Sequence, residues 1–286
     1  MTTPRHTLLA AAAATCLGLL LPAAGQAATS PDAGDYTALP AGTDLLLLYG
    51  QHNSADQLRA DGRTAVDNLG LKLDVGLLRW VHFTTWNGYT IDPQIVVPFG
   101  RQKVGLSGEK TSGLGDIIFG GTLWTIADLQ RGEHLGWSLF VTAPTGADKR
   151  EGFALSDNRW AADLQVGYIR RFAPQWSIDL IGQTELYQDR RDTKSEKAPL
   201  VRGFAHLRYH LSDATHLAVS YRHTLGAKET LDGTTLSGRK NDGNVTLTWA
   251  SFLTKQVQLQ LQASQDVKVE NGPKLRTVGV RALYAF

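Results

Sequence analysis

The last twelve residues of the chain, 275–286, alternate between two kinds of side chain. Every second residue is apolar: Val278, Val280, Ala282, Tyr284 and Phe286. On the other face Thr277, Gly279 and Arg281 are small or polar, and Leu283 and Ala285 weaken that face only at its end. A period of two places each set on one face of a β-strand, whereas an α-helix would scatter both sets around its axis. A chain that ends on such a strand leaves an unpaired edge, and another strand has to pair with it.

The opposite end of the chain has the features of a secretory signal peptide. Arg5 precedes an apolar run from Leu8 to Leu21, and small residues around Ala27 predict cleavage there. The run is too short to cross a membrane comfortably, so we expect residues 1–27 to be removed on export. The only cysteine, Cys16, lies in this segment. The exported protein is therefore expected to form no disulfide and no thiolate metal site.

The charge balance argues against nucleic acid as a partner. The chain has 29 Lys and Arg, and loss of Arg5 leaves 28 against 27 Asp and Glu, a formal charge of +1. A nucleic-acid-binding domain would carry a basic excess. After the signal peptide no stretch approaches about 18 consecutive apolar residues, so no transmembrane helix is predicted.

The alternation of the C-terminal segment recurs along the chain. We predict twelve strands, at 44–52, 69–85, 89–99, 114–126, 135–144, 159–171, 176–187, 200–211, 216–224, 244–252, 256–266 and 275–286. Connections after odd-numbered strands are long and most of those after even-numbered strands are short, as in an up-and-down membrane barrel. The prediction is an all-β fold, a 12-stranded up-and-down transmembrane β-barrel of the bacterial outer membrane. It spans residues 44–286 and follows a polar lead at 28–43, which is either a periplasmic tail or a partial plug.

The alternation also assigns side chains to lipid or to lumen. In the second strand, the apolar face from Leu69 to Phe83 is predicted to face lipid, with Arg79 reaching along it to an interface. Leu259 and Leu261 are likewise predicted to face lipid, with Gln260 in the lumen. Aromatic residues near the strand ends predict two interfacial girdles. They include Tyr49, Phe99 and Trp160 near the long loops and Trp86, Trp124, Trp137, Trp176, Trp249 and Phe252 near the short turns.

Charged and polar residues in the inward phase are the candidate functional residues. The predicted lumen-facing set is Lys72, Asp74, Asp92, Asp116, Asp163, Asp179, Glu185, Arg202, His206, Arg208, Arg222 and Arg281. Acids of the sixth and seventh strands would face bases of the eighth and ninth. This arrangement predicts either a transverse field that orients polar solutes or an internal salt-bridge network that fills the barrel. Twelve strands give a backbone diameter of roughly 24 Å, which leaves room for a small aromatic compound but not for a folded protein.

Several short strings resemble one family of outer-membrane proteins. They are Asp35-Tyr36-Thr37-Ala38-Leu39-Pro40-Ala41-Gly42-Thr43, Ser112-Gly113-Leu114-Gly115-Asp116, Pro144-Thr145-Gly146, Asn158-Arg159-Trp160 and Val269-Glu270-Asn271-Gly272. Their order resembles the meta-pathway phenol-degradation family, whose members are often called transporters. The C-terminal strand, with Tyr284 and Phe286, resembles the assembly signal of outer-membrane barrels. These resemblances imply a channel for small hydrophobic or aromatic compounds, with outer-membrane lipid and the barrel-assembly machinery as partners.

Two other functions stay open on the sequence, a lipid hydrolase and a closed structural barrel. The outward-phase candidates for a hydrolase, His223 and Ser251, lie near opposite ends of their strands, so proton transfer between them is not expected. His206 and His210 are four residues apart, about 13 Å on a strand, so they predict no shared metal ion. We therefore expect no cofactor, no metal and no catalytic residue.

Overall fold

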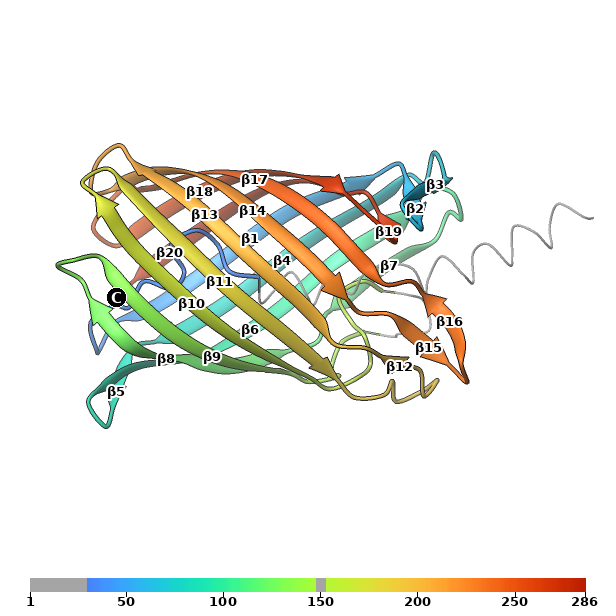
Figure 1. Ribbon diagram of the computed structural model, residues 1–286, viewed down its shortest axis with the longest axis horizontal. Helices are drawn as coiled ribbons and strands as arrows, with labels where there is room; N and C mark the ends of the chain where they lie inside the picture. The colour runs from blue at the N-terminus through green and yellow to red at the C-terminus, as the bar shows by residue number, and fades with distance from the viewer. Residues whose placement is uncertain (1–29, 148–152) are drawn as a thin grey trace, which may run out of the picture.

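The computed structural model describes residues 30–147 and 153–286, and the predicted signal peptide (1–27) lies outside them. Twelve long strands, each paired with the next along the chain, form a closed antiparallel barrel (Figure 1). They are β1 (Asp44–Ala55), β4 (Leu71–His82), β6 (Tyr89–Val104), β8 (Ile118–Asp128), β9 (Glu133–Thr142), β10 (Ala161–Ala173), β11 (Trp176–Tyr187), β13 (Leu200–His210), β14 (Thr215–Gly226), β17 (Lys240–Phe252), β18 (Val257–Lys268) and β20 (Arg276–Ala285). Each predicted strand overlaps one of them, and the 12-stranded barrel is confirmed.

The first and last strands close the barrel. β1 and β20 pair in register from Leu45 opposite Ala285 to Ser54 opposite Arg276. Beyond that ladder, the Asp44 amide donates to the Phe286 carbonyl at 2.9 Å, and the Phe286 amide donates back at 3.0 Å. Closure leaves no strand edge facing lipid, where an unpaired backbone group is costly. The unpaired edge expected at the C-terminus is thus met by β1.

The two ends of the barrel differ (Figure 1). One end has the short connections and the hairpin of β5 (Thr84–Trp86) with β6, whose turn residues Asn87 and Gly88 both have positive φ, 48° and 81°. The other end has the long loops, which contain β7 (Lys110–Leu114) and two small sheets. One sheet is β2 (Leu58–Ala60), β3 (Arg63–Val66) and β19 (Gly272–Pro273), and the other is β12 (Glu196–Lys197), β15 (Glu229–Leu231) and β16 (Thr234–Ser237). In the described ranges no α-helix is long and apolar enough to cross a membrane.

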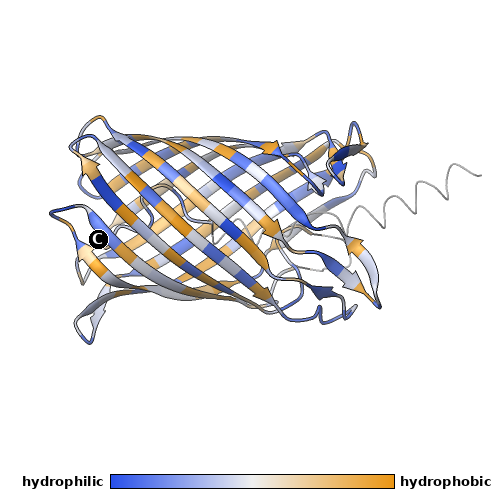
Figure 2. Ribbon diagram, in the orientation of Figure 1, coloured by the Kyte–Doolittle hydropathy of each residue, from blue (hydrophilic) through white to orange (hydrophobic). Residues whose placement is uncertain are grey.

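Hydrophobic and polar residues alternate along the strands, as Figure 2 shows. On β18, Leu261 is 47% exposed on the outer face while Gln260 is 1% exposed. On β20, Val278 and Val280 are exposed on the outer face and Arg281 is buried. The predicted faces of these two strands are therefore correct.

The predicted faces of the second strand are wrong. In β4, Leu73, Val75 and Leu77 are buried inside the barrel, where they belong to one apolar cluster with Phe153 and Leu155. Lys72 and Asp74 consequently point outward, contrary to the prediction that they line the lumen. Asp74 pairs at the outer surface with Arg101 at 2.7 Å and with His52 at 2.6 Å. The prediction failed because this strand is apolar on both faces, with Leu78 and Trp80 toward lipid.

Two residues assigned to the aromatic girdles also face inward. Trp124 is 2% exposed, packs against Phe83 at 5.5 Å between ring centroids, and donates its indole N–H to the Tyr36 carbonyl at 3.0 Å. Tyr49 is buried with Arg281 near its ring. The other girdle candidates with large exposed side chains include Trp86, Trp137 and Trp160. Position near a strand end does not by itself decide the face.

The two faces of β17 can be tested at adjacent positions. Leu247 is 56% exposed on the outer face, so Leu247→Arg should lower the free energy of unfolding by about 2–4 kcal/mol near the middle of the bilayer. Thr246 lines the interior cavity described below, so Thr246→Arg should cost much less. Urea titrations of both variants refolded in lipid vesicles would measure the difference. Equal losses would show that the faces of β17 are misassigned.

Candidate functional site in the barrel lumen

The segment before the first strand lies inside the barrel. Residues 30–43 (Figure 1, blue) run along the lumen and contact inward-facing side chains of several strands. The Gly34 amide donates to Asp179 Oδ2 at 2.7 Å, and the Tyr36 hydroxyl donates to Gln165 Oε1 at 2.9 Å. The same hydroxyl lies 2.8 Å from Ser138 Oγ. These bonds satisfy polar groups that would otherwise be buried without partners.

Local sequence explains the bend of this segment. The Asp35 amide donates to the Asp32 carbonyl at 3.1 Å, and the Thr37 amide donates to the Gly34 carbonyl at 3.0 Å. Gly34 has a φ of 94°, a conformation that glycine adopts without steric cost. Pro31 sets the chain direction just before the turn. The turn therefore presents both Asp32 and Asp35 to the barrel wall.

Two arginines of the wall hold these two carboxylates. Arg281 of β20 contacts Asp32 at 3.1 Å and Asp35 at 2.9 Å, and Arg79 of β4 contacts Asp35 at 3.4 Å. The Arg281 side chain is 6% exposed. A buried charge is tolerated when it is paired and hydrogen-bonded, so each partner depends on the others. Arg79 was predicted to reach a lipid interface and instead points into the lumen.

Two glycines make room for the Tyr36 ring. A Cβ added at Gly167 of β10 would lie 2.3 Å from Cγ of Tyr36, and one at Gly136 of β9 would lie 2.9 Å from Cδ1. Any larger residue at Gly167 would therefore displace the ring. The pair of glycines forms a seat on the wall for Tyr36, which is 5% exposed.

Four of the remaining predicted lumen residues form two ion pairs between neighbouring strands. Arg208 donates two hydrogen bonds to Asp179 Oδ1, at 3.0 and 2.8 Å, and Arg202 lies 3.6 Å from Glu185. Each pair joins β11 to β13. The structure thus matches an internal salt-bridge network, the second of the two arrangements considered from the sequence, rather than two separated walls of charge.

Polar partners hold the other inward carboxylates. Asp163 accepts from Gln165 at 2.9 Å and from Gln183 at 2.6 Å, and Asp92 accepts from Gln94 at 3.2 Å. Asp116 is buried in the β7–β8 connection, where it accepts from the amides of Gly146 and Asp157, both at 2.8 Å. It therefore fixes loop backbone and does not project from a strand.

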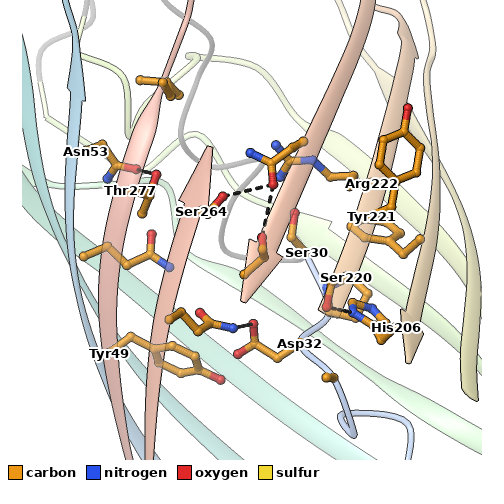
Figure 3. Close-up of a pocket in the computed structure, with 18 of the residues that line it drawn as sticks. Ser30, Asp32, Tyr49, Asn53, His206, Ser220, Tyr221, Arg222, Ser264 and Thr277 are labelled. Atoms are coloured by element: carbon orange, nitrogen blue, oxygen red, sulfur yellow. Dashed lines mark hydrogen bonds between the residues drawn. The ribbon is translucent and has the colours of Figure 1, made fainter. Parts of the chain in front are cut away.

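An interior cavity of about 180 Å³ lies beside residues 30–33 (Figure 3). One side of it is polar, with Arg222, Asn244 and Asp266 from β14, β17 and β18. The other side includes the apolar residues Leu77 and Val96 from β4 and β6. His206, also at the cavity, has its Nδ1 at 2.7 Å from Ser220 Oγ. The lumen next to the N-terminal segment is thus amphipathic.

Ion pairs join the long loops at the rim. Arg159, which is 1% exposed, contacts Glu229 and lies 3.2 Å from Asp157, and Lys197 lies 2.7 Å from the same Asp157 oxygen. Burial alone would raise the pKa of the Asp157 carboxyl, but Lys197 and Arg159 outweigh it and hold that pKa below its ordinary value. These contacts connect the segment before β10 to the β12–β15–β16 sheet.

The hydrolase candidates do not meet. Ser251 of β17 lies opposite Thr215 of β14. His223 lies eight residues after Thr215 in β14, which places it about 26 Å from Ser251 along the strands at roughly 3.3 Å per residue. His223 instead has its Nδ1 3.2 Å from the Tyr221 hydroxyl, and Ser251 lies 2.7 Å from Thr215 Oγ1. Within residues 30–147 and 153–286, no three His, Cys, Asp or Glu side chains are grouped to hold a metal ion.

Several important residues were missed from the sequence. The missed set is Asp32, Arg79, Gly136, Gly167, Asn244 and Asp266. Two acids three residues apart in a segment without basic residues were a usable signal, because such charges need partners once buried. Glycines at inward strand positions were a second signal of a close approach by another segment.

The closed antiparallel barrel with an apolar outer face defines an outer-membrane β-barrel protein, and similarity to known proteins narrows this class to channels. A family model described as "Putative MetA-pathway of phenol degradation" matches residues 55–282, so the chain belongs to this family, as its short strings predicted. The structure is similar to that of an outer membrane channel from Pseudomonas putida F1, with 32% sequence identity and a TM-score of 0.86. The match covers 90% of this chain and 100% of that one.

More distant structures share the fold alone. The transport unit of the autotransporter AIDA-I from Escherichia coli has a TM-score of 0.54 at 9% identity, covering 96% of this chain and 98% of that one. The CymD monoaromatic hydrocarbon channel has a TM-score of 0.50 at 8% identity, covering 86% and 89%. No curated protein sequence matches this chain. The protein is a bacterial outer-membrane β-barrel of the channel type.

The ion cluster between the N-terminal segment and the wall gives a stability prediction. Arg281→Gln leaves Asp32 and Asp35 with less compensation in a buried site, so it should lower the free energy of unfolding by about 3–5 kcal/mol. Arg276→Gln, on the exposed face of the same strand, is the matched control and should change it little. Urea titration of the refolded variants measures both. A similar loss in the two variants would contradict the role given to Arg281.

Proposed function

We propose that this protein is an outer-membrane channel for small hydrophobic or aromatic compounds, and that residues 30–43 form a partial plug in it. The observation that carries the proposal is the amphipathic lumen, in which the N-terminal segment leaves a small cavity between an apolar and a polar wall. An open porin for ions and sugars would keep a wide aqueous passage. A narrow passage with one apolar wall and one polar wall instead suits a small, largely apolar compound.

The charge network supports selection against ions. Arg281, Arg208 and Arg202 are each committed to carboxylates of the wall or of the plug. A passing ion would lose its hydration in this interior, and these three arginines are already paired with carboxylates. An apolar solute loses no such hydration and gains contact with the apolar wall. The family description, which refers to phenol degradation, supports the same solute class.

The proposal includes no catalysis. The similar solved structures reported above are channels and a transport unit, and His223 and Ser251 lie far apart on the outer face. A lipid hydrolase would need a nucleophile and a base within hydrogen-bonding reach. Phospholipid hydrolysis by the purified protein, lost in Ser251→Ala, would overturn this part of the proposal.

The plug can be tested with a pair of glycine substitutions. Gly167→Ala should push Tyr36 off the wall, loosen residues 30–43 and raise the single-channel conductance in planar bilayers. Gly203→Ala is the matched control, because a Cβ there meets nothing within 4 Å. Deletion of residues 30–40 should raise the conductance further. Unchanged conductance in both Gly167→Ala and the deletion variant, with the barrel still folded, would refute the plug.

Recognition of the last strand by the barrel-assembly machinery is a separate part of the proposal. Tyr284 and Phe286 are 44% and 58% exposed on the outer face, and their rings stack with centroids 5.6 Å apart. They are therefore accessible to a partner as the barrel closes. Phe286→Asp should leave the protein in the periplasm, and Leu253→Asp, in an exposed turn, should not. Normal heat-modifiable migration of the Phe286→Asp protein from outer membranes would contradict this.

A further inference from the structure

Arg222 is the charged residue of the cavity whose side chain is least satisfied. In the described part of the chain its one ion pair is with Asp266, with Nη2 4.0 Å from Oδ1, and its buried Nε has no hydrogen-bond partner. By contrast, Arg208 donates two hydrogen bonds to Asp179. Asp266 does not depend on Arg222, because it accepts from Asn244 at 2.9 Å and from the Leu275 amide at 2.8 Å. A guanidinium has five N–H donors, so Arg222 keeps donors for another acceptor.

The charges around the cavity cancel. Among the described lining residues, Arg79 and Arg222 are positive and Asp32 and Asp266 are negative, so two charges balance two. An anionic solute would bring a charge without a counterpart and would approach Asp266 next to Arg222. A neutral solute keeps the balance. An uncharged oxygen atom can still accept a hydrogen bond from the guanidinium, and such bonds to charged donors are the stronger ones.

Apolar and aromatic surface lies within reach of the same arginine. Phe204 of β13 is directly opposite Arg222 of β14 in the strand register, and both line the cavity. Leu77 and Val96 cover the far side. The volume of about 180 Å³ is enough for one ring, since an apolar cavity of about 150 Å³ holds benzene. Phe204 can offer such a ring an offset or edge contact.

We infer that this cavity is a binding site for a neutral monoaromatic compound with a hydrogen-bond-accepting oxygen, and that Arg222 is the donor that recognises the oxygen. This inference rests on the proposed function and specifies which aromatic compounds the channel retains. In the inferred complex the ring lies between Phe204 and the apolar wall, and its oxygen points toward the Arg222 guanidinium. Arg222 thereby separates oxygenated aromatics from plain hydrocarbons and from aromatic acids.

The test compares three ring compounds on the full mature protein in lipid nanodiscs. Phenol, toluene and benzoate share one ring and differ in the polar group. Equilibrium dialysis should give a dissociation constant for phenol about tenfold lower than for toluene, which lacks the acceptor, and also lower than for benzoate. Arg222→Met should remove the preference for phenol over toluene, and Arg222→Lys should keep part of it. Arg276→Met, on the outer face, should change neither value.

The possible results distinguish failure of the inferred binding site from failure of the proposed channel function. Equal binding of phenol and toluene to the wild-type protein, a preference for benzoate, or an unchanged preference in Arg222→Met would each overturn the inference. The wild-type comparison needs no variant, so it holds even if Arg222→Met fails to fold. Uptake of labelled toluene and phenol by porin-deficient cells that express the protein tests the channel separately. Uptake of both without a binding preference overturns the site alone, whereas no uptake of either overturns the proposed function.

Discussion

Backbone hydrogen bonding in hydrocarbon is the constraint on which this structure depends. A lipid-exposed strand cannot leave its N–H and C=O groups unpaired, so the sheet has to close. The ladder between β1 and β20 provides that closure, and the bonds between Asp44 and Phe286 extend it to the last residue. The barrel size follows from closure, since twelve tilted strands fix a backbone diameter of roughly 24 Å. Everything inside the barrel has to fit that space.

The lumen is organised by the requirement that buried charges be paired. β4 and β20 each place an arginine in the interior, and the wall next to them offers few acids. Asp32 and Asp35 come instead from the chain before β1, so the N-terminal segment belongs to the electrostatics of the barrel. Tyr36 adds a packing contact, which the small inward residues Gly136 and Gly167 permit. The wall and the segment are therefore complementary in both charge and shape.

Strand positions were predictable from the sequence because a strand with lipid on one face and the lumen on the other alternates between apolar and polar residues with a period of two. The prediction was correct where the two faces differ in polarity, as on β18, with its leucines outward and glutamines inward. It was wrong on β4, where Leu73, Val75 and Leu77 face the interior, because an apolar lumen wall looks the same as a lipid face. The partner of Asp32 in the interior was not predictable, for a related reason. That partner, Arg281, lies almost the whole chain away, and periodicity carries no information on such contacts.

The failed prediction on β4 also identifies what distinguishes this lumen from an aqueous pore. A water-filled channel has polar residues on its whole inner face, so that the alternation in each strand points the same way. Here β1 and β4 have apolar residues on both faces, and the inner ones, such as Leu47 and Leu77, cluster with Phe153 and Leu155 from a long loop. Such a wall has no polar group to replace the hydration of an ion. It does remove apolar solute surface from water, which stabilises the bound solute by about 25 cal/mol per Å² of buried apolar area. In the proposed channel, selection for apolar solutes follows from the barrel wall itself, and the N-terminal segment narrows the space beside that wall.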